Sequence, residues 1–173
     1  MCKVYTPYAH AKSIFEIEID FYKKHGIKTV LSDLDNTLDS YKTKTPSANV
    51  VSFKQLLEEN RIELFIISNN TGKRVQEYAN ALGVRYASAV GKPFARKLIR
   101  KLKEAQIDLK TAVLIGDQTV TDIASANRAR ILCILTDKIV KEDQPTTHFN
   151  RLFDRPIRRH LKRRGKLIDW RER

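Results

Sequence analysis

The sequence predicts an α/β protein built on a Rossmann-like parallel sheet with helices on both faces. Two observations support this fold class. Short apolar runs, as expected of buried strands, alternate along the chain with longer stretches in which apolar residues recur at helical spacing. Polar residues follow several of these runs at the point where each run ends. Alternation of this kind is typical of a parallel sheet, which binds its ligands at the carboxyl ends of the strands.

The expected elements can be placed along the chain in order. A first helix carries Ile14, Ile17 and Phe21 on one face and ends near Gly26. A Val- and Leu-rich strand follows at residues 28–34, short enough to be buried. The later strands are expected at residues 63–70, 84–90, 111–117 and 131–137, and the later helices at residues 47–62, 72–83, 93–106 and 120–129.

Length and composition predict one domain followed by a tail. A chain of 173 residues that is 42% hydrophobic can bury one core, and we place the domain at residues 1–150 and the tail at residues 151–173. Cys2 and Cys133 lie too far apart to suggest a disulfide framework or metal-ligand spacing. The chain shows neither a signal peptide nor an apolar run long enough to span a bilayer, so we expect a cytoplasmic location.

Three aspartates stand where predicted strands end. Asp33 and Asp35 are two residues apart in an extended segment, so their side chains point the same way, and Asp117 ends a later strand. Carboxylate oxygens are the ligands that Mg²⁺ prefers, and a nucleophilic carboxylate beside one that handles a proton suits phosphoryl transfer through an aspartyl phosphate. For a single aspartate, a role in a turn or a helix cap remains the alternative.

Two other interpretations of these segments fail on particular letters. A calcium-binding EF-hand loop that starts at Asp33 needs Gly at Leu38 and Glu at Lys44. A Walker-type phosphate loop that ends at Lys92 needs Gly at Tyr86 and Ser or Thr at Pro93. Neither kind of site is therefore expected.

Residues 28–136 resemble the haloacid dehalogenase superfamily of phosphohydrolases, with four motifs in order. The pattern "DLDNT" implies that Asp33 is the nucleophile, that Asp35 is the general acid and base, and that Thr37 supports the phosphate-binding loop. The second motif is a serine at the end of an apolar strand, and "LFIISNN" meets it with Ser68. The resemblance implies that Ser68 and the adjacent donor Asn69 hold the phosphoryl oxygens.

The third and fourth motifs supply charge to the same site. Lys92 in "GKPFARKL" precedes a predicted helix, and the resemblance implies that it balances the charge on the attacking carboxylate and the phosphate. In "GDQTVTD", the resemblance implies that Asp117 ligates Mg²⁺ together with Asp33 and Asp35, while Asp122 steadies Lys92 or a metal-bound water.

Within the superfamily, the chain resembles the capless phosphatases of subclass IIIA and their YqeG family. The segments after Thr37 and between Ser68 and Lys92 leave no room for an inserted cap domain. An open site suits a phosphate displayed on a large substrate, such as a phospholipid head group like that of phosphatidylglycerophosphate. The related lipid phosphatases tend to carry Lys and Cys where this chain has Leu34 and Thr37, so their substrate does not simply carry over.

The predicted tail is strongly basic. Residues 151–173 hold ten Lys or Arg against three acidic residues, which is +7 of the chain's net +13. Such a segment favours an anionic membrane surface, with the protein peripheral to it, or a nucleic acid. Two alternatives stay open: a solvated tail without a partner, and packing of Leu161, Leu167, Ile168 and Trp170 on the sheet.

The sequence as a whole leaves two candidate functions. The protein is either a Mg²⁺-dependent phosphatase of a large anionic substrate, or a nucleic-acid or ribosome-binding protein with weak phosphatase activity.

Overall fold

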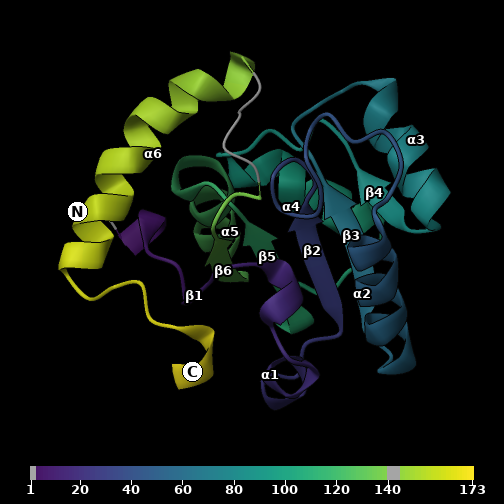
Figure 1. Ribbon diagram of the computed structural model, residues 1–173, viewed down its shortest axis with the longest axis horizontal. Coiled ribbons are helices and arrows are strands. Elements are labelled where there is room, and N and C mark those ends of the chain that lie inside the picture. The colour runs from purple at the N-terminus through teal and green to yellow at the C-terminus, as the bar shows by residue number, and fades with distance from the viewer. Residues whose placement is uncertain (1–2, 140–144) are drawn as a thin grey trace.

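A computed structural model describes residues 3–139 and 145–173 and confirms the predicted fold class. The described strands form one six-stranded sheet in the order β1-β6-β5-β2-β3-β4, and all of its neighbouring strands are parallel (Figure 1). The strands are β1 (Ala9–Ala11), β2 (Thr29–Asp33), β3 (Glu63–Ile67), β4 (Arg85–Ala87), β5 (Ala112–Gly116) and β6 (Leu132–Thr136).

Helices cover both faces of this sheet. They are α1 (Ile19–Lys24), α2 (Ala48–Glu59), α3 (Lys73–Leu82), α4 (Ala95–Glu104), α5 (Ala124–Ala129) and α6 (Pro145–Arg163). Successive residues of a strand point to opposite faces, so Val30 belongs to the core that α1, α2 and α3 cover, whereas Leu31 belongs to the core under α4 and α5. Burial on both faces explains why these strands are short continuous apolar runs.

The sequence pattern missed one strand. β1 pairs in parallel with β6 at the edge of the sheet, and its three residues, Ala-His-Ala, show too little periodicity to be recognised. The first predicted helix is also shorter than expected: a 3₁₀ turn at Ile14–Glu16 precedes α1. Both differences lie at the amino-terminal end, before β2 and Asp33.

The connections at the carboxyl ends of β2 and β3 are too short to form a separate domain. Residues 34–47 join β2 to α2, and α3 is the helix between β3 and β4. Among residues 3–139 and 145–173, no cap domain is inserted into the sheet. The described helices also include none that is long and apolar enough to cross a bilayer.

The basic carboxyl-terminal segment is folded against the domain. α6 spans the predicted boundary at residue 150 and runs beside the part of the sheet that carries β1 and β6 (Figure 1). Leu161 and Trp170 are buried, and the Trp170 ring packs edge-on against Phe21 with 6.1 Å between ring centroids. The backbone N–H of His10 donates to the Ile168 carbonyl at 2.7 Å. These contacts favour the packing alternative for the tail, and a functional division at residue 150 stays a prediction.

Candidate active site

The predicted nucleophile lies where β2 ends and the chain turns sharply. Asp33 is the last residue of β2, and Asn36, with φ of 67°, adopts the left-handed backbone that Asn tolerates better than most residues. The turn is closed by the Asn36 N–H, which donates to the Asp39 carbonyl at 2.8 Å. The sequence "DLDNT" therefore ends a buried strand and carries both aspartates to the carboxyl edge of the sheet.

Lys92 joins two of the predicted aspartates. Its ammonium Nζ lies 2.6 Å from Asp33 Oδ1 and 2.7 Å from Asp122 Oδ1, and all three residues are buried. Burial opposes protonation of Lys92, but the carboxylates of Asp122 and Asp33 outweigh burial and raise its pKa above the ordinary value. Lys92 is therefore a permanent cation at physiological pH, as a charge-balancing lysine must be.

Three carboxylates converge beside this lysine. One oxygen atom from each of Asp33, Asp117 and Asp122 lies within 4.8 Å of the others. Burial raises the pKa of Asp33; Lys92 lowers it, but repulsion from Asp122 and Asp117 adds to burial, so the pKa lies well above the ordinary value. An acidic cluster that resists ionisation is one that a divalent cation would stabilise.

Gly116 makes the approach of Asp122 to this cluster possible. A Cβ atom at Gly116 would stand 2.4 Å from Asp122 Cγ, closer than real side chains come. The Asp122 carboxylate also accepts a hydrogen bond from the Gln118 backbone N–H at 3.0 Å through Oδ2. Residues 116–122 thus fold back on themselves, which places Asp117 and Asp122 side by side.

The carboxylate of Asp35 is not part of the group of three, so its predicted role as a Mg²⁺ ligand beside Asp33 and Asp117 stays a prediction. Its Oδ1 accepts a hydrogen bond from Arg74 Nη1 at 2.5 Å, and its Oδ2 accepts one from Asn70 Nδ2 at 3.0 Å. Arg74 also donates from Nη2 to the carbonyls of Ser40 and Thr43. The side chain of Asp35 is thus oriented by a cation from α3.

The predicted phosphate-binding residues surround the same strand ends. Ser68 follows β3, is buried, and accepts a hydrogen bond from the Asn70 N–H at 3.1 Å. Asn69 exchanges two hydrogen bonds with the Lys92 backbone, donating to its carbonyl at 2.8 Å and accepting from its N–H at 2.7 Å. Thr37 is buried in the loop after β2. In this structure Asn69 therefore fixes the lysine segment, so its predicted phosphate contact stays untested.

Sequence reasoning missed two kinds of residue at the site. Arg74 and Asn70 contact Asp35, yet arginines are numerous in this chain and nothing in the local pattern marks these two residues. Asp154 and Arg158 of α6 contact the loop that carries Asp117, but they belong to a segment interpreted as a basic tail. Only the folding of α6 against the domain brings them to the site.

The arrangement agrees with a comparison of the whole chain against known families. A model of the haloacid dehalogenase-like hydrolases matches residues 9–130, which include every predicted site residue. The chain belongs to this hydrolase family.

A relative of this hydrolase is known over nearly its whole length. A Bacillus subtilis (strain 168) protein named "Probable phosphatase YqeG" is 31% identical over 170 residues, which cover 98% of each chain. The hydrolase is therefore a phosphoric monoester hydrolase of the haloacid dehalogenase type and of the YqeG family.

Solved structures share the fold of this hydrolase. A cobalt-bound deoxy-D-mannose-octulosonate 8-phosphate phosphatase of Haemophilus influenzae has a TM-score of 0.50 at 16% identity, with 84% of this chain and 93% of that chain covered. A putative 3-deoxy-D-manno-octulosonate 8-phosphate phosphatase of Vibrio cholerae has a TM-score of 0.51 at 15% identity, with 91% and 97% covered. At these identities the likeness shows the fold alone.

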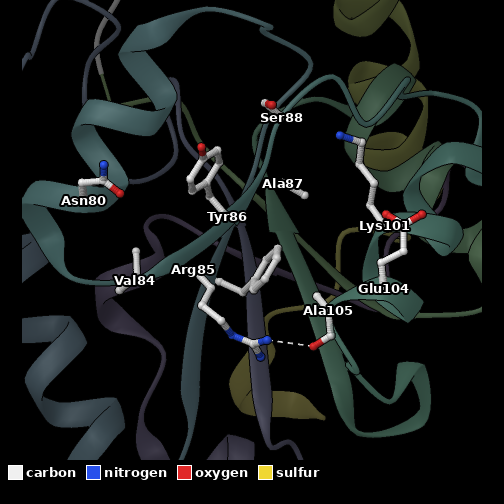
Figure 2. Close-up of a pocket in the computed structure, with 10 residues that line it drawn as sticks. Asn80, Val84, Arg85, Tyr86, Ala87, Ser88, Lys101, Glu104 and Ala105 are labelled. Atoms are coloured by element: carbon white, nitrogen blue, oxygen red, sulfur yellow. Dashed lines mark hydrogen bonds between the residues drawn. The ribbon is translucent and has the colours of Figure 1, made fainter.

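The hydrolase also has a groove that none of Asp33, Asp117 and Asp122 lines. It measures about 640 Å³ and lies beside edge strand β4, between the end of α3 and α4 (Figure 2). Phe65, Val84 and Tyr86 supply apolar surface, whereas Arg85 reaches across to donate to the Ala105 carbonyl at 2.8 Å. None of the predicted catalytic residues lines this groove.

Proposed function

We propose that this protein is a Mg²⁺-dependent phosphatase that hydrolyses a phosphate monoester through an aspartyl phosphate on Asp33. The observation that carries the proposal is the position of Lys92 Nζ, 2.6 Å from Asp33 Oδ1 and 2.7 Å from Asp122 Oδ1. The buried cation lowers the pKa of Asp33 and so opposes the effect of burial, which favours the anion that a nucleophilic carboxylate must be. Asp122 anchors this cation while Asp33 changes its charge during the reaction.

In the first half of the reaction, an oxygen of Asp33 attacks the phosphorus. The bond between phosphorus and the ester oxygen breaks, and Asp35 gives a proton to that leaving oxygen. In the second half, water attacks the phosphorus of the acyl phosphate and gives its proton to Asp35. The bond to Asp33 then breaks, which releases inorganic phosphate and restores both carboxyl groups.

The positions of the other side chains support this division of work. Arg74 and Asn70 hold the Asp35 carboxylate outside the acidic cluster, which would leave it available to exchange a proton with the leaving group. Ser68, at the end of β3, would donate to the phosphoryl oxygens with backbone N–H groups near it. Thr37 supports the loop that follows Asp33, and Asn69 holds the backbone of Lys92.

The residues present fit a divalent cation. Three carboxylate oxygens within 4.8 Å of one another form an all-oxygen donor set, and hard cations such as Mg²⁺ take carboxylate oxygen and substrate phosphate. Asp33 and Asp117 would hold the ion, with Asp122 engaged mainly by Lys92. A bound Mg²⁺ would supply positive charge that offsets the repulsion between the Asp33 carboxylate and the incoming phosphate.

The test is hydrolysis of p-nitrophenyl phosphate by protein stripped of metal with EDTA and then resupplied with Mg²⁺. We expect activity with Mg²⁺, none with EDTA, and none for Asp33→Asn, because an amide cannot form the acyl phosphate. Asp20→Asn, on the exposed surface of α1, is the control. Asp35→Asn should lose about 100-fold to 10,000-fold with alkyl phosphates, since these leaving groups require a proton. Turnover by Asp33→Asn at the wild-type rate would contradict the assignment.

We propose further that the natural phosphate is displayed on a large anionic assembly, such as the head groups of a phospholipid surface. Phe94 at the start of α4 and Leu152 on α6 are 70% and 69% exposed, more than the other large apolar side chains among the described residues. Phe94 follows Lys92 by two residues, and Leu152 is two residues from Asp154, which contacts the Asp117 loop. The exposed cations Arg96 and Arg155 lie near them in sequence. Apolar side chains beside cations suit an anionic lipid interface.

Cosedimentation with vesicles tests this surface. Vesicles rich in phosphatidylglycerol should bind the protein and phosphatidylcholine vesicles should not, and the double change Phe94→Ser with Leu152→Ser should weaken binding. Leu56→Ser, at an exposed position of α2, is the matched control. Binding of RNA but not of vesicles would instead favour the nucleic-acid alternative, because the basic α6 would then act through phosphate contacts.

A further inference from the structure

Arg158 of α6 forms hydrogen bonds with the loop that carries Asp117. Its Nη2 donates to the backbone carbonyl of Asp117 at 2.7 Å and to that of Thr136, at the end of β6, at 2.6 Å. Its Nη1 donates to Asp137 Oδ1 at 3.0 Å. One guanidinium therefore ties the ends of β5 and β6 together on the carboxyl side of the sheet.

Asp154 lies one helical turn before Arg158. It binds the same loop at Thr119, two residues after Asp117. Its Oδ1 accepts hydrogen bonds from the backbone N–H and the hydroxyl of Thr119, both at 2.6 Å. Its Oδ2 accepts one from Arg158 Nε at 3.1 Å. Asp154 is 1% exposed, so its carboxylate depends on these partners for the hydrogen bonds that water would otherwise supply.

The two side chains thus hold the backbone at Asp117 itself and two residues after it. Arg158 fixes its carbonyl, and Asp154 fixes the backbone at Thr119, while the Gln118 N–H between them donates to Asp122. With its backbone held in this way, the Asp117 side chain has little freedom to leave the acidic cluster. A carboxylate that must bind a cation in competition with water gains affinity from such restraint.

We propose that Asp154 and Arg158 are positioning residues that orient Asp117 for the divalent cation. The proposal rests on the proposed function, because it takes Asp117 as a metal ligand. It also gives α6 a second role besides any attachment to a polyanion: the helix completes the support of the metal-binding loop. Both residues would act through the backbone of the Asp117 loop.

Magnesium affinity of the protein without substrate tests the proposal. Isothermal titration calorimetry of EDTA-stripped, dialysed protein with MgCl₂ would be compared for the wild type, Arg158→Gln and Asp154→Ala. We expect each variant to bind Mg²⁺ about 10-fold to 100-fold more weakly, the range found when partners of metal ligands are removed. Arg159→Gln, at an exposed neighbouring position of α6, should bind as the wild type does.

Two milder changes keep the test valid if those variants do not fold. Thr119→Val removes the hydroxyl donor to Asp154 and leaves the backbone donor in place, and Arg158→Lys keeps the charge but not the forked geometry. Both should show intermediate Mg²⁺ affinity. The metal-free melting temperature is measured for every variant, because a merely structural role would lower this temperature and leave the Mg²⁺ affinity of the folded protein unchanged.

The outcomes separate this proposal from the proposed function. If the wild type binds Mg²⁺ and hydrolyses p-nitrophenyl phosphate, while Arg158→Gln or the two milder variants bind Mg²⁺ as tightly as it does, the positioning role is wrong and the phosphatase assignment stands. If the wild type itself neither binds Mg²⁺ nor gains activity from it, the proposed function fails first.

Discussion

The guanidinium of Arg74 lies 2.5 Å from a carboxylate oxygen of Asp35, and this ion pair joins α3 to the loop after β2. Both side chains are mostly shielded from solvent, with 27% and 17% of their surfaces exposed. Arg74 also binds the carbonyls of Ser40 and Thr43, so it organises the loop as well as the carboxylate.

Arg74→Ala should therefore impair the step that needs a proton. Without Arg74, Asp35 loses its fixed direction, and proton transfer to a poor leaving group slows more than turnover of an activated ester. We expect kcat to fall by about 100-fold for glycerol phosphate and by much less for p-nitrophenyl phosphate. Arg74→Lys, which keeps the charge, should recover part of the loss. Equal losses for both esters would show that Arg74 acts only on folding or binding.

The stability of the metal-free protein should depend on pH through Asp33. Burial together with Asp122 and Asp117 raises the pKa of Asp33 in the folded state, so the folded protein binds this proton more tightly than the unfolded chain does. The associated stability is fully present below the unfolded pKa, about 3.9, and is lost as pH rises through the folded pKa. Melting curves in EDTA should thus show Asp33→Asn gaining on the wild type as pH increases from 4 to 8. If the melting temperatures of the two proteins change with pH in parallel, the pKa of Asp33 is not raised in the folded state.

Magnesium should offset much of the stability that the folded protein loses when the buried Asp33 ionises. The melting temperature of the wild type at pH 7 should rise on addition of MgCl₂, because the ion binds the folded cluster and not the unfolded chain. Asp117→Ala should abolish most of the rise, whereas Asp108→Asn, which changes a cap at the opposite end of β5 from Asp117, should retain it. A full rise in Asp117→Ala would place the ion elsewhere.

Gly116→Ala should inactivate the enzyme without a large change in fold. The new methyl group would stand 2.4 Å from Asp122 Cγ, so Asp122 must move, and Lys92 would lose one of its two carboxylate partners. We expect loss of p-nitrophenyl phosphate hydrolysis with a near-native circular dichroism spectrum. Gly72→Ala, where a Cβ meets nothing within 4 Å, is the control and should stay active.

Trp170→Ala should destabilise the whole domain. The side chain is 5% exposed and packs on Phe21, so its removal should lower the free energy of unfolding by about 3–5 kcal/mol. Lys166→Ala, at an exposed position of the same segment, should have little effect. Urea unfolding of the three proteins measures the difference, and a Trp170→Ala variant as stable as the wild type would restore the interpretation of residues 151–173 as an independent tail.

Several strands and the polar residues at their ends are set by consecutive residues of the chain and could therefore be predicted from the sequence. The short apolar runs of β2, β3 and β5 are a property of consecutive residues, and each run ends at a polar group: Asp33, Ser68 and Asp117. Because parallel strands end at one edge of a sheet, their convergence follows from fold class without knowledge of side-chain geometry. Lys92 and Asp122 were identified by motif spacing, and the structure brings them to Asp33.

Tertiary structure alone decided which groups surround those residues. Arg74 reaches Asp35 across 39 positions of sequence, and Arg158 reaches the Asp117 carbonyl across 41, so no local pattern could mark either one among the chain's many cations. The charge of residues 151–173 predicts solvent exposure or a polyanion partner, yet Leu161 and Trp170 are buried against the domain. Their burial holds the segment on the domain, which brings Asp154 and Arg158 of α6 to the loop that carries Asp117. The sequence thus determined which polar residues stand at the strand ends, and the packing of α6 determined which side chains hold the backbone of the Asp117 loop in place.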